Sequence, residues 1–144
     1  MRTVASVADW RTMRAEIESA GNTLGFVPTM GTLHAGHTSL VERSLEENAK
    51  TVVSIFVNPT QFNDPTDLEN YPRTLDVDTQ TLEELGVDDL FLPDRSTVYP
   101  DDYRYRLTET DLSTRLCGAH RPGHFEGVLT VVMRLFNIIR PHRA

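Results

Sequence analysis

Two histidines three residues apart stand between an apolar segment and a helical pattern. The stretch reads FVPTMGTLHAGHTSL over residues 26–40. At this spacing the side chains of His34 and His37 can reach one ligand at the start of a helix. The free N–H groups of a helix start suit an anion, and Gly31 and Gly36 allow close approach of the backbone. The stretch therefore predicts a nucleotide phosphate site.

The same residues admit three competing interpretations. Isolated histidines often lie on the surface or cap a helix. A metal site would need a carboxylate or thiolate on the same turn, so we assign no protein metal ligand. Residues 31–38 read G-x-x-x-x-G-H-T, which differs from the P-loop by a histidine in place of the lysine. That lysine reaches the β- and γ-phosphates, so its absence argues against a P-loop.

Apolar periodicity predicts the elements that position this turn. A helix capped at Ser6 is expected to run to about Ala20, where Gly21 follows as a stop. We then expect strand Leu24–Thr29, helix Ala35–Asn48, strand Thr51–Val57, helix Leu75–Leu85 and strand Asp89–Leu92. This alternation predicts an α/β fold: a parallel sheet with helices on both faces, whose ligands lie beyond the carboxyl ends of the strands.

The remaining segments are less regular. Residues 58–74 hold three prolines and predict a long loop that can include one short helical turn. Loose alternation over residues 103–108 predicts an antiparallel edge strand, and residues 111–116 predict a helical turn. A strongly apolar pattern predicts a buried helix over Glu126–Ile139.

Composition limits the class of protein. The 144 residues include 14 Lys and Arg against 21 Asp and Glu, a net charge of −7, which opposes nonspecific binding of nucleic acid. The single cysteine, Cys117, cannot form an internal disulfide, and no stretch approaches the ~18 apolar residues that cross a membrane. We expect one cytoplasmic nucleotide-binding domain over residues 1–144, which binds neither nucleic acid nor membranes.

Several motifs resemble those of a known family. The sequence His34-Ala35-Gly36-His37 resembles the H-x-G-H signature of adenylyl and cytidylyl transferases. Four blocks, in the same order, resemble the pantothenate synthetase family: PTMGTLHAGH (28–37), FVNPTQF (56–62), YPRT (71–74) and RPGHFEGV (121–128). The resemblance implies a Rossmann-like domain that condenses pantoate with β-alanine, using ATP and Mg²⁺. The intermediate would be pantoyl adenylate, and AMP and pyrophosphate would be released.

The resemblance also implies roles for individual residues. The ATP-binding residues would be Met30, Gly31, His34, Gly36 and His37, of which the two histidines are catalytic. The residues that bind pantoate or β-alanine would be Pro28, Met30, Asn58, Gln61, Phe62, Arg121, His124, Val131 and Val132. The chemistry agrees, because an amide such as Gln61 can bind hydroxyl and carboxylate groups and arginine forks onto a carboxylate.

Plainer roles remain open for several of these residues. Asn58 precedes a proline, which is an ordinary turn signal. Val131 and Val132 fit a hydrophobic core equally well, and Arg121 and His124 could simply cap the following helix.

The end of the chain departs from the family pattern. After the counterpart of Pro141 the family continues into a strand, a Gly-x-Lys-Asp-x-x-Gln segment and a smaller C-terminal domain. We therefore expect a domain truncated at its C-terminal end, almost inactive alone, whose full-length protein is a homodimer. Two alternatives remain: a nucleotide-binding module without enzymatic activity, and another H-x-G-H nucleotidyltransferase, in which Gln61 and residues 121–124 would have no assigned role.

Overall fold

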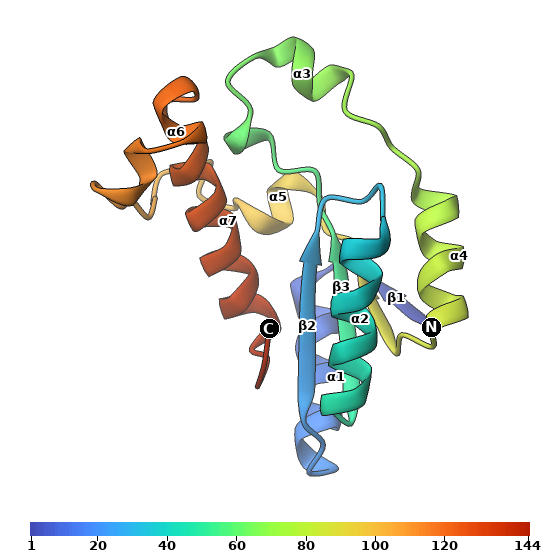
Figure 1. The fold of residues 1–144 in the computed structure, drawn as a ribbon. Helices are drawn as coiled ribbons and strands as arrows, with labels where there is room; N and C mark the ends of the chain where they lie inside the picture. The colour runs from blue at the N-terminus through green and yellow to red at the C-terminus, as the bar shows by residue number, and fades with distance from the viewer.

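A four-stranded parallel sheet forms the centre of the computed structural model, which describes residues 1–144 (Figure 1). Its strands are β1 (Arg2–Val4), β2 (Leu24–Thr29), β3 (Lys50–Ile55) and β4 (Asp89–Phe91). They lie in the order β1-β4-β3-β2, and β2 pairs with β3 along its whole length, from Leu24 opposite Lys50 to Thr29 opposite Ile55. The predicted α/β class is confirmed.

The helices cover both faces of the sheet because the chain crosses it in two directions. Helix α1 (Val7–Ser19) leads from β1 at one edge to β2 at the other, whereas α2 (Ala35–Glu47) and α4 (Leu75–Leu85) lead back through β3 to β4. Right-handed crossovers in opposite directions place their helices on opposite faces. Figure 1 shows α2 in front of the sheet and α1 behind it. Helix α7 (His124–Ile139) packs beside α1.

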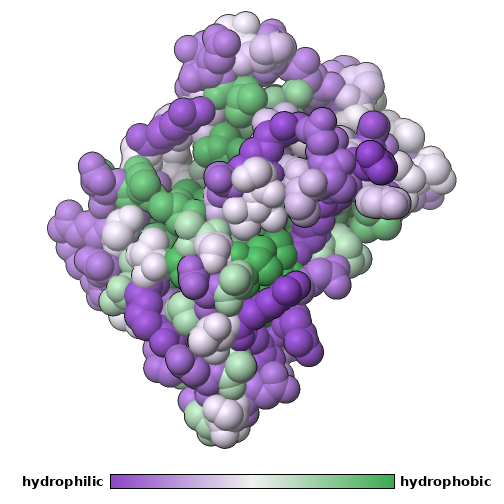
Figure 2. Space-filling model, turned by 180° about the vertical axis from the view of Figure 1, so that it is seen from behind, coloured by the Kyte–Doolittle hydropathy of each residue, from purple (hydrophilic) through white to green (hydrophobic).

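Two hydrophobic cores result, one on each face. Alternate residues of each strand supply them, so Phe26 and Val52 face α1 and α7, and Val27 and Val53 face α2 and α4. Burial on both faces explains why apolar residues stand next to each other in these strands instead of alternating with polar ones. The surface in Figure 2 is mostly hydrophilic, with apolar residues showing between polar ones.

The loops contain short helical turns. These are η1 (Pro59–Gln61), α3 (Pro65–Glu69), α5 (Arg95–Val98), η2 (Leu112–Thr114) and α6 (Cys117–His120). The helical turn predicted over residues 111–116 is therefore present, and α7 begins at His124, two residues before the predicted start. The three-residue strand β1 was not predicted, because so short a segment shows no periodicity.

The edge strand predicted over residues 103–108 is wrong. The N–H of Tyr105 donates to Asp101, and its carbonyl accepts from Arg134. The N–H of Leu107 donates to the hydroxyl of Thr130 on α7. Side chains thus satisfy the backbone groups that would otherwise pair with a neighbouring strand.

Residues 142–143 run along the free edge of β2. The N–H of His142 donates to the Leu24 carbonyl at 2.8 Å, and the N–H of Phe26 donates to the Arg143 carbonyl at 2.9 Å. A parallel bridge joins Gly25 to Arg143. No helix in the structure is both long and apolar enough to cross a membrane.

Candidate active site

Two neighbouring cavities lie where β2 and β3 end and α7 begins. The smaller, of about 230 Å³, is bounded by the end of β2, by Phe56 and Asn58 after β3, and by one side of α7. The larger, of about 650 Å³, lies between the loop after β3 and the segment before α7. Met30, Gln61 and Tyr71 line both. The position matches the expectation for ligands of a parallel α/β sheet.

The turn from β2 to α2 is held by one buried carboxylate. Gly31 and Thr32 both adopt left-handed backbone conformations, with φ of 82° and 55°. Asp78 on α4, 3% exposed, accepts hydrogen bonds from the N–H of Thr32 at 2.9 Å and of Leu33 at 2.8 Å. Because both carboxylate oxygens are used, Asp78 fixes the backbone in a conformation that Thr32 would not adopt alone.

Sequence reasoning missed Asp78, although the sequence carried a signal. Asp78 lies four residues before the buried Leu82, so it falls on the core-facing side of α4. A carboxylate on such a face needs partners, because burying an unpaired charge is costly. The glycine-containing turn supplies them.

His34 and His37 lie together at the first turn of α2. Their ring centroids are 4.1 Å apart. The N–H of Gly36 donates to His34 Nδ1 at 3.1 Å, so Nδ1 is an acceptor and the hydrogen of the neutral ring is on Nε2, ready to donate to an anion. A Cβ at Gly36 would lie 2.9 Å from His34 Cε1, so the glycine makes room for this capping ring.

The environment of His37 disfavours the protonated form of its imidazole. Its Nδ1 is buried without a hydrogen-bond partner in the chain. Burial lowers the pKa of His37 below its usual value, charge on His34 lowers it further, and Asp78 raises it in part. A ligand that supplies negative charge would restore the protonated form.

The smaller cavity combines an apolar wall with few polar groups. Pro28, Met30, Val131 and Val132 line it together with His37. Val131, 6% exposed, also belongs to the hydrophobic core, so it packs and lines the cavity at once. Such a wall suits a small ligand with an apolar body.

Asn58 and Gln61 form the polar side of the smaller cavity. Asn58 is 1% exposed, and its Nδ2 donates to Gln61 Oε1 at 3.0 Å and to the Gly127 carbonyl at 3.2 Å. Its Oδ1 accepts from the hydroxyl of Tyr99 at 2.7 Å. The Asn58 amide is thus fully engaged within the protein, and Gln61 is the residue with donors left for a ligand.

The larger cavity is polar. Gln61, Phe62, Arg121 and His124 line it, and the ring of Phe62 packs edge-on against Tyr71 with centroids 5.5 Å apart. His124 Nδ1 lies 2.8 Å from the Gln61 carbonyl, which can only accept, so Nδ1 carries a hydrogen and, in the neutral ring, Nε2 is an acceptor. The sequence had not indicated the other polar lining residues, which are Asn63, Asp67, Asn70 and His120.

The structure brings the predicted site residues together. Those that line one or both cavities are Pro28, Met30, Gly31, His37, Asn58, Gln61, Phe62, Arg121, His124, Val131 and Val132. His34 and Gly36 lie beside His37 at the exposed start of α2. Their individual roles in binding or catalysis stay predictions.

Comparison with known proteins agrees with this arrangement. The family model described as pantoate-beta-alanine ligase matches residues 2–144. The pantothenate synthetase of Fervidobacterium nodosum is 51% identical over 144 residues, which are 100% of this chain and 51% of that protein. That of Bdellovibrio bacteriovorus is 57% identical over 122 residues, covering 85% of this chain and 49% of that protein.

Solved structures share the fold. The pantoate-beta-alanine ligase from Francisella tularensis, complexed with beta-gamma ATP and beta-alanine, superimposes with a TM-score of 0.93 at 43% identity. The match covers 98% of this chain and 54% of that one. Pantothenate synthetase from Thermus thermophilus gives a TM-score of 0.89 at 48% identity, covering 100% of this chain and 51% of that one.

The chain spans about half the length of the curated relatives it matches. Within that half, the family model covers nearly every residue, and the structural agreement extends across the sheet and the loops at its carboxyl edge. The chain belongs to the pantoate–β-alanine ligase family.

Proposed function

We propose that residues 1–144 bind ATP and pantoate, and that the complete protein, meaning the natural polypeptide containing this chain, condenses pantoate with β-alanine. One observation carries the proposal: His37 and Gln61 line the same small cavity. His37 lies at the start of α2, where free N–H groups can bind an anion. Phosphate and a small polar acid would meet in this cavity. The Francisella tularensis ligase, solved with beta-gamma ATP and beta-alanine, supports the nucleotide and the amine.

In the proposed first step, a carboxylate oxygen of pantoate attacks the α-phosphorus of ATP in line. An O–P bond forms to give pantoyl adenylate, and the bond to the departing pyrophosphate breaks. Negative charge grows on the phosphate oxygens, where fixed donors are most effective. His34 Nε2–H, His37 and the free N–H groups of α2 would supply these donors.

Mg²⁺ would enter as part of the MgATP substrate. Residues 1–144 contain no group of three acidic, histidine or cysteine side chains that could hold a metal ion. Mg²⁺ commonly keeps several waters and binds through the phosphates of its nucleotide. The donors described above would act on the remaining phosphate charge.

In the proposed second step, the amine of β-alanine attacks the acyl carbon of pantoyl adenylate. A C–N bond forms, the C–O bond to AMP breaks, and the amine loses a proton. The larger cavity has groups for this substrate: the Arg121 guanidinium can fork onto its carboxylate, and the acceptor Nε2 of His124 can take the proton.

Pyrophosphate release by the complete protein tests this function. We expect release from ATP to require pantoate, and β-alanine to convert a single turnover into continuous turnover with pantothenate and AMP as products. Release that ignores pantoate would contradict the proposal and favour another nucleotidyltransferase. Binding of ATP without any release would favour a nucleotide-binding module. Light scattering on the same sample would test the homodimer that the family resemblance implies.

A further inference from the structure

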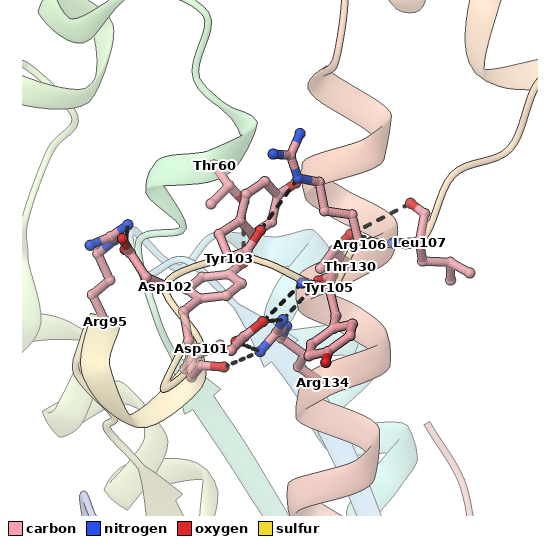
Figure 3. Close-up of polar contacts among 12 residues, drawn as sticks. Thr60, Arg95, Asp101, Asp102, Tyr103, Tyr105, Arg106, Leu107, Thr130 and Arg134 are labelled. Atoms are coloured by element: carbon pink, nitrogen blue, oxygen red, sulfur yellow. Dashed lines mark hydrogen bonds and ion pairs between the residues drawn. The ribbon is translucent and has the colours of Figure 1, made fainter.

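Arg134 joins helix α7 to the loop after α5. Its guanidinium donates to both carboxylate oxygens of Asp101, at 2.6 and 2.9 Å, and to the carbonyls of Val98 and Tyr105. Figure 3 shows Arg134 and Asp101 facing each other between the helix and the loop. Arg134 holds the pKa of the Asp101 carboxyl well below its usual range, so the pair stays ionised near neutral pH.

This ion pair fixes the aromatic ring of Tyr99. The Arg134 guanidinium carbon lies 4.9 Å from the centroid of that ring, a cation–π contact, and Tyr103 packs edge-on against it at 5.3 Å. Tyr99 is 3% exposed. Its hydroxyl is therefore held at one place, 2.7 Å from Asn58 Oδ1.

The orientation of the Asn58 amide follows from its partners. The Gly127 carbonyl can only accept a hydrogen bond, so the atom 3.2 Å from it must be Nδ2. The N–H of Thr60 can only donate, so the atom 3.4 Å from it must be Oδ1. The Tyr99 hydroxyl adds the shortest of these contacts on the Oδ1 side.

Asn58 in turn orients Gln61. Its Nδ2 is a donor, so the Gln61 atom 3.0 Å away must be the acceptor Oε1. The Nε2 group of Gln61 is then left with its hydrogens free, on a residue that lines both cavities. Gln61 can therefore offer its Nε2 donors to an acceptor oxygen of a ligand.

We propose that Tyr99 and Asn58 are positioning residues that fix Gln61 as a hydrogen-bond donor toward the acceptor oxygens of the acid substrate. The inference rests on the proposed function, in which that acid is pantoate. It reassigns Asn58, which the sequence suggested as a direct substrate contact. It also gives a role to Tyr99, Arg134 and Asp101, which lie outside the four sequence blocks.

Steady-state kinetics of the complete protein test the proposal through separate KM values for pantoate and ATP. Tyr99→Phe removes only the hydroxyl and is expected to raise the KM for pantoate about tenfold, the worth of roughly one hydrogen bond. Asn58→Asp cannot donate to Gln61 and should raise it about 100-fold. The KM for ATP should stay within about twofold of the unaltered protein, which general loosening of the fold would not allow.

The neighbouring Tyr103→Phe is the matched control. It makes the same chemical change to a ring that packs on Tyr99 but does not contact Asn58, so the KM for pantoate should not change. Gln61→Glu tests the donor role of Gln61 directly, because its free oxygen would repel an acceptor, and Tyr99→Phe keeps the positioning role testable if Asn58→Asp does not fold. Gln61→Glu should also raise the KM for pantoate about 100-fold.

The outcomes separate this inference from the proposed function. If the unaltered protein releases no pyrophosphate with pantoate, the proposed function fails and the inference fails with it. If the protein is active but either Tyr99→Phe or Gln61→Glu leaves the KM for pantoate unchanged, only the inference is overturned. It is also overturned if both variants raise the KM for ATP and pantoate equally.

Discussion

The turn after β2 and the turn after β3 reach the same cavity, but they are held by opposite chemistry. The first is fixed through its backbone, by the buried carboxylate of Asp78. The second is fixed through its side chains, by the neutral amide of Asn58. A carboxylate can only accept, and Asp78 accepts from the N–H groups of Thr32 and Leu33 and from the Thr74 hydroxyl. An amide both donates and accepts, so the orientation of Asn58 determines which atom of Gln61 faces it.

The two turns supply different things to the cavity. In the turn after β2, the hydrogen bonds to Asp78 fix the backbone so that His34 and His37 lie at the start of α2. In the turn after β3, the hydrogen bond from Asn58 determines that the Nε2 group of Gln61 remains free to donate to a ligand. Changes at Asp78 should therefore lower both the stability of the fold and the binding of ATP. Changes at Asn58 should weaken the binding of pantoate alone.

The largest expected effect is that of Asp78→Asn. Asparagine keeps one acceptor oxygen, so its NH₂ group would face a partly buried N–H of the turn and leave that N–H unsatisfied. We expect the free energy of unfolding to fall by about 3 kcal/mol, measured by urea denaturation. Asp76→Asn, at an exposed position of the same helix, is the control and should cost less than about 0.5 kcal/mol. Equal stability of the two variants would contradict the role of Asp78.

A smaller effect is expected from Gly31→Ala. Gly31 has φ of 82°, and an added Cβ would lie 3.1 Å from Asp78 Oδ2 and 3.3 Å from Ile55 Cγ2. We expect a loss of about 2 kcal/mol, from backbone strain plus displacement of Asp78. Gly86→Ala is a matched control, because Gly86 has φ of 84° with nothing within 4 Å. It should cost only about 1 kcal/mol. If Gly31→Ala lowers the free energy of unfolding no more than Gly86→Ala does, the contact with Asp78 contributes nothing to the cost.

The smallest effect is a shift in the titration of His37. Its pKa is lowered, so we expect its NMR resonances to titrate below the usual value of 6.5. His34→Asn keeps a capping side chain but removes a charge that lowers this pKa, so the His37 pKa should rise. Titration of His37 above 6.5 in the unaltered chain would contradict the described environment.

The same shift sets a pH dependence of stability. Near and below pH 6.5 the unfolded chain binds a proton at His37 more readily than the folded chain does. The contribution of His37 to stability therefore falls as the pH falls through 6.5, and it is constant above that range. Urea denaturation at a series of pH values, compared with His37→Asn, would measure it.

Much of the fold could be predicted because strong apolar periodicity determines it. The strand Leu24–Thr29 has the predicted bounds, and the strand Lys50–Ile55 overlaps the strand predicted over Thr51–Val57 from the run TVVSIFV. The helix between them, Ala35–Glu47, ends one residue before its predicted end at Asn48. The three-residue strand β1 and the loop over residues 103–108 could not be predicted. Their structure depends on partners far along the chain, such as Asp89 for β1 and Arg134 for the loop.

The site residues that were predicted belong to sequence motifs. The residues that were not predicted bind those motifs and hold them in place. Asp78 belongs to a helix that was predicted only to position the turn, and Tyr99 belongs to a segment for which nothing was predicted from the sequence. Their importance becomes visible only when the chain brings them next to Thr32 and Asn58. A polar residue on a buried helix face was the one local signal, and it applied to Asp78 alone.

A crystal structure of the complete protein with a nonreactive ATP analogue and pantoate would test the division between the two turns most directly. We predict phosphate oxygens within hydrogen-bond distance of His34 Nε2 and His37, and a pantoate oxygen accepting from Gln61 Nε2. The Gln61 Oε1 would still accept from Asn58. Phosphates bound away from α2, or pantoate bound away from Gln61, would contradict this account.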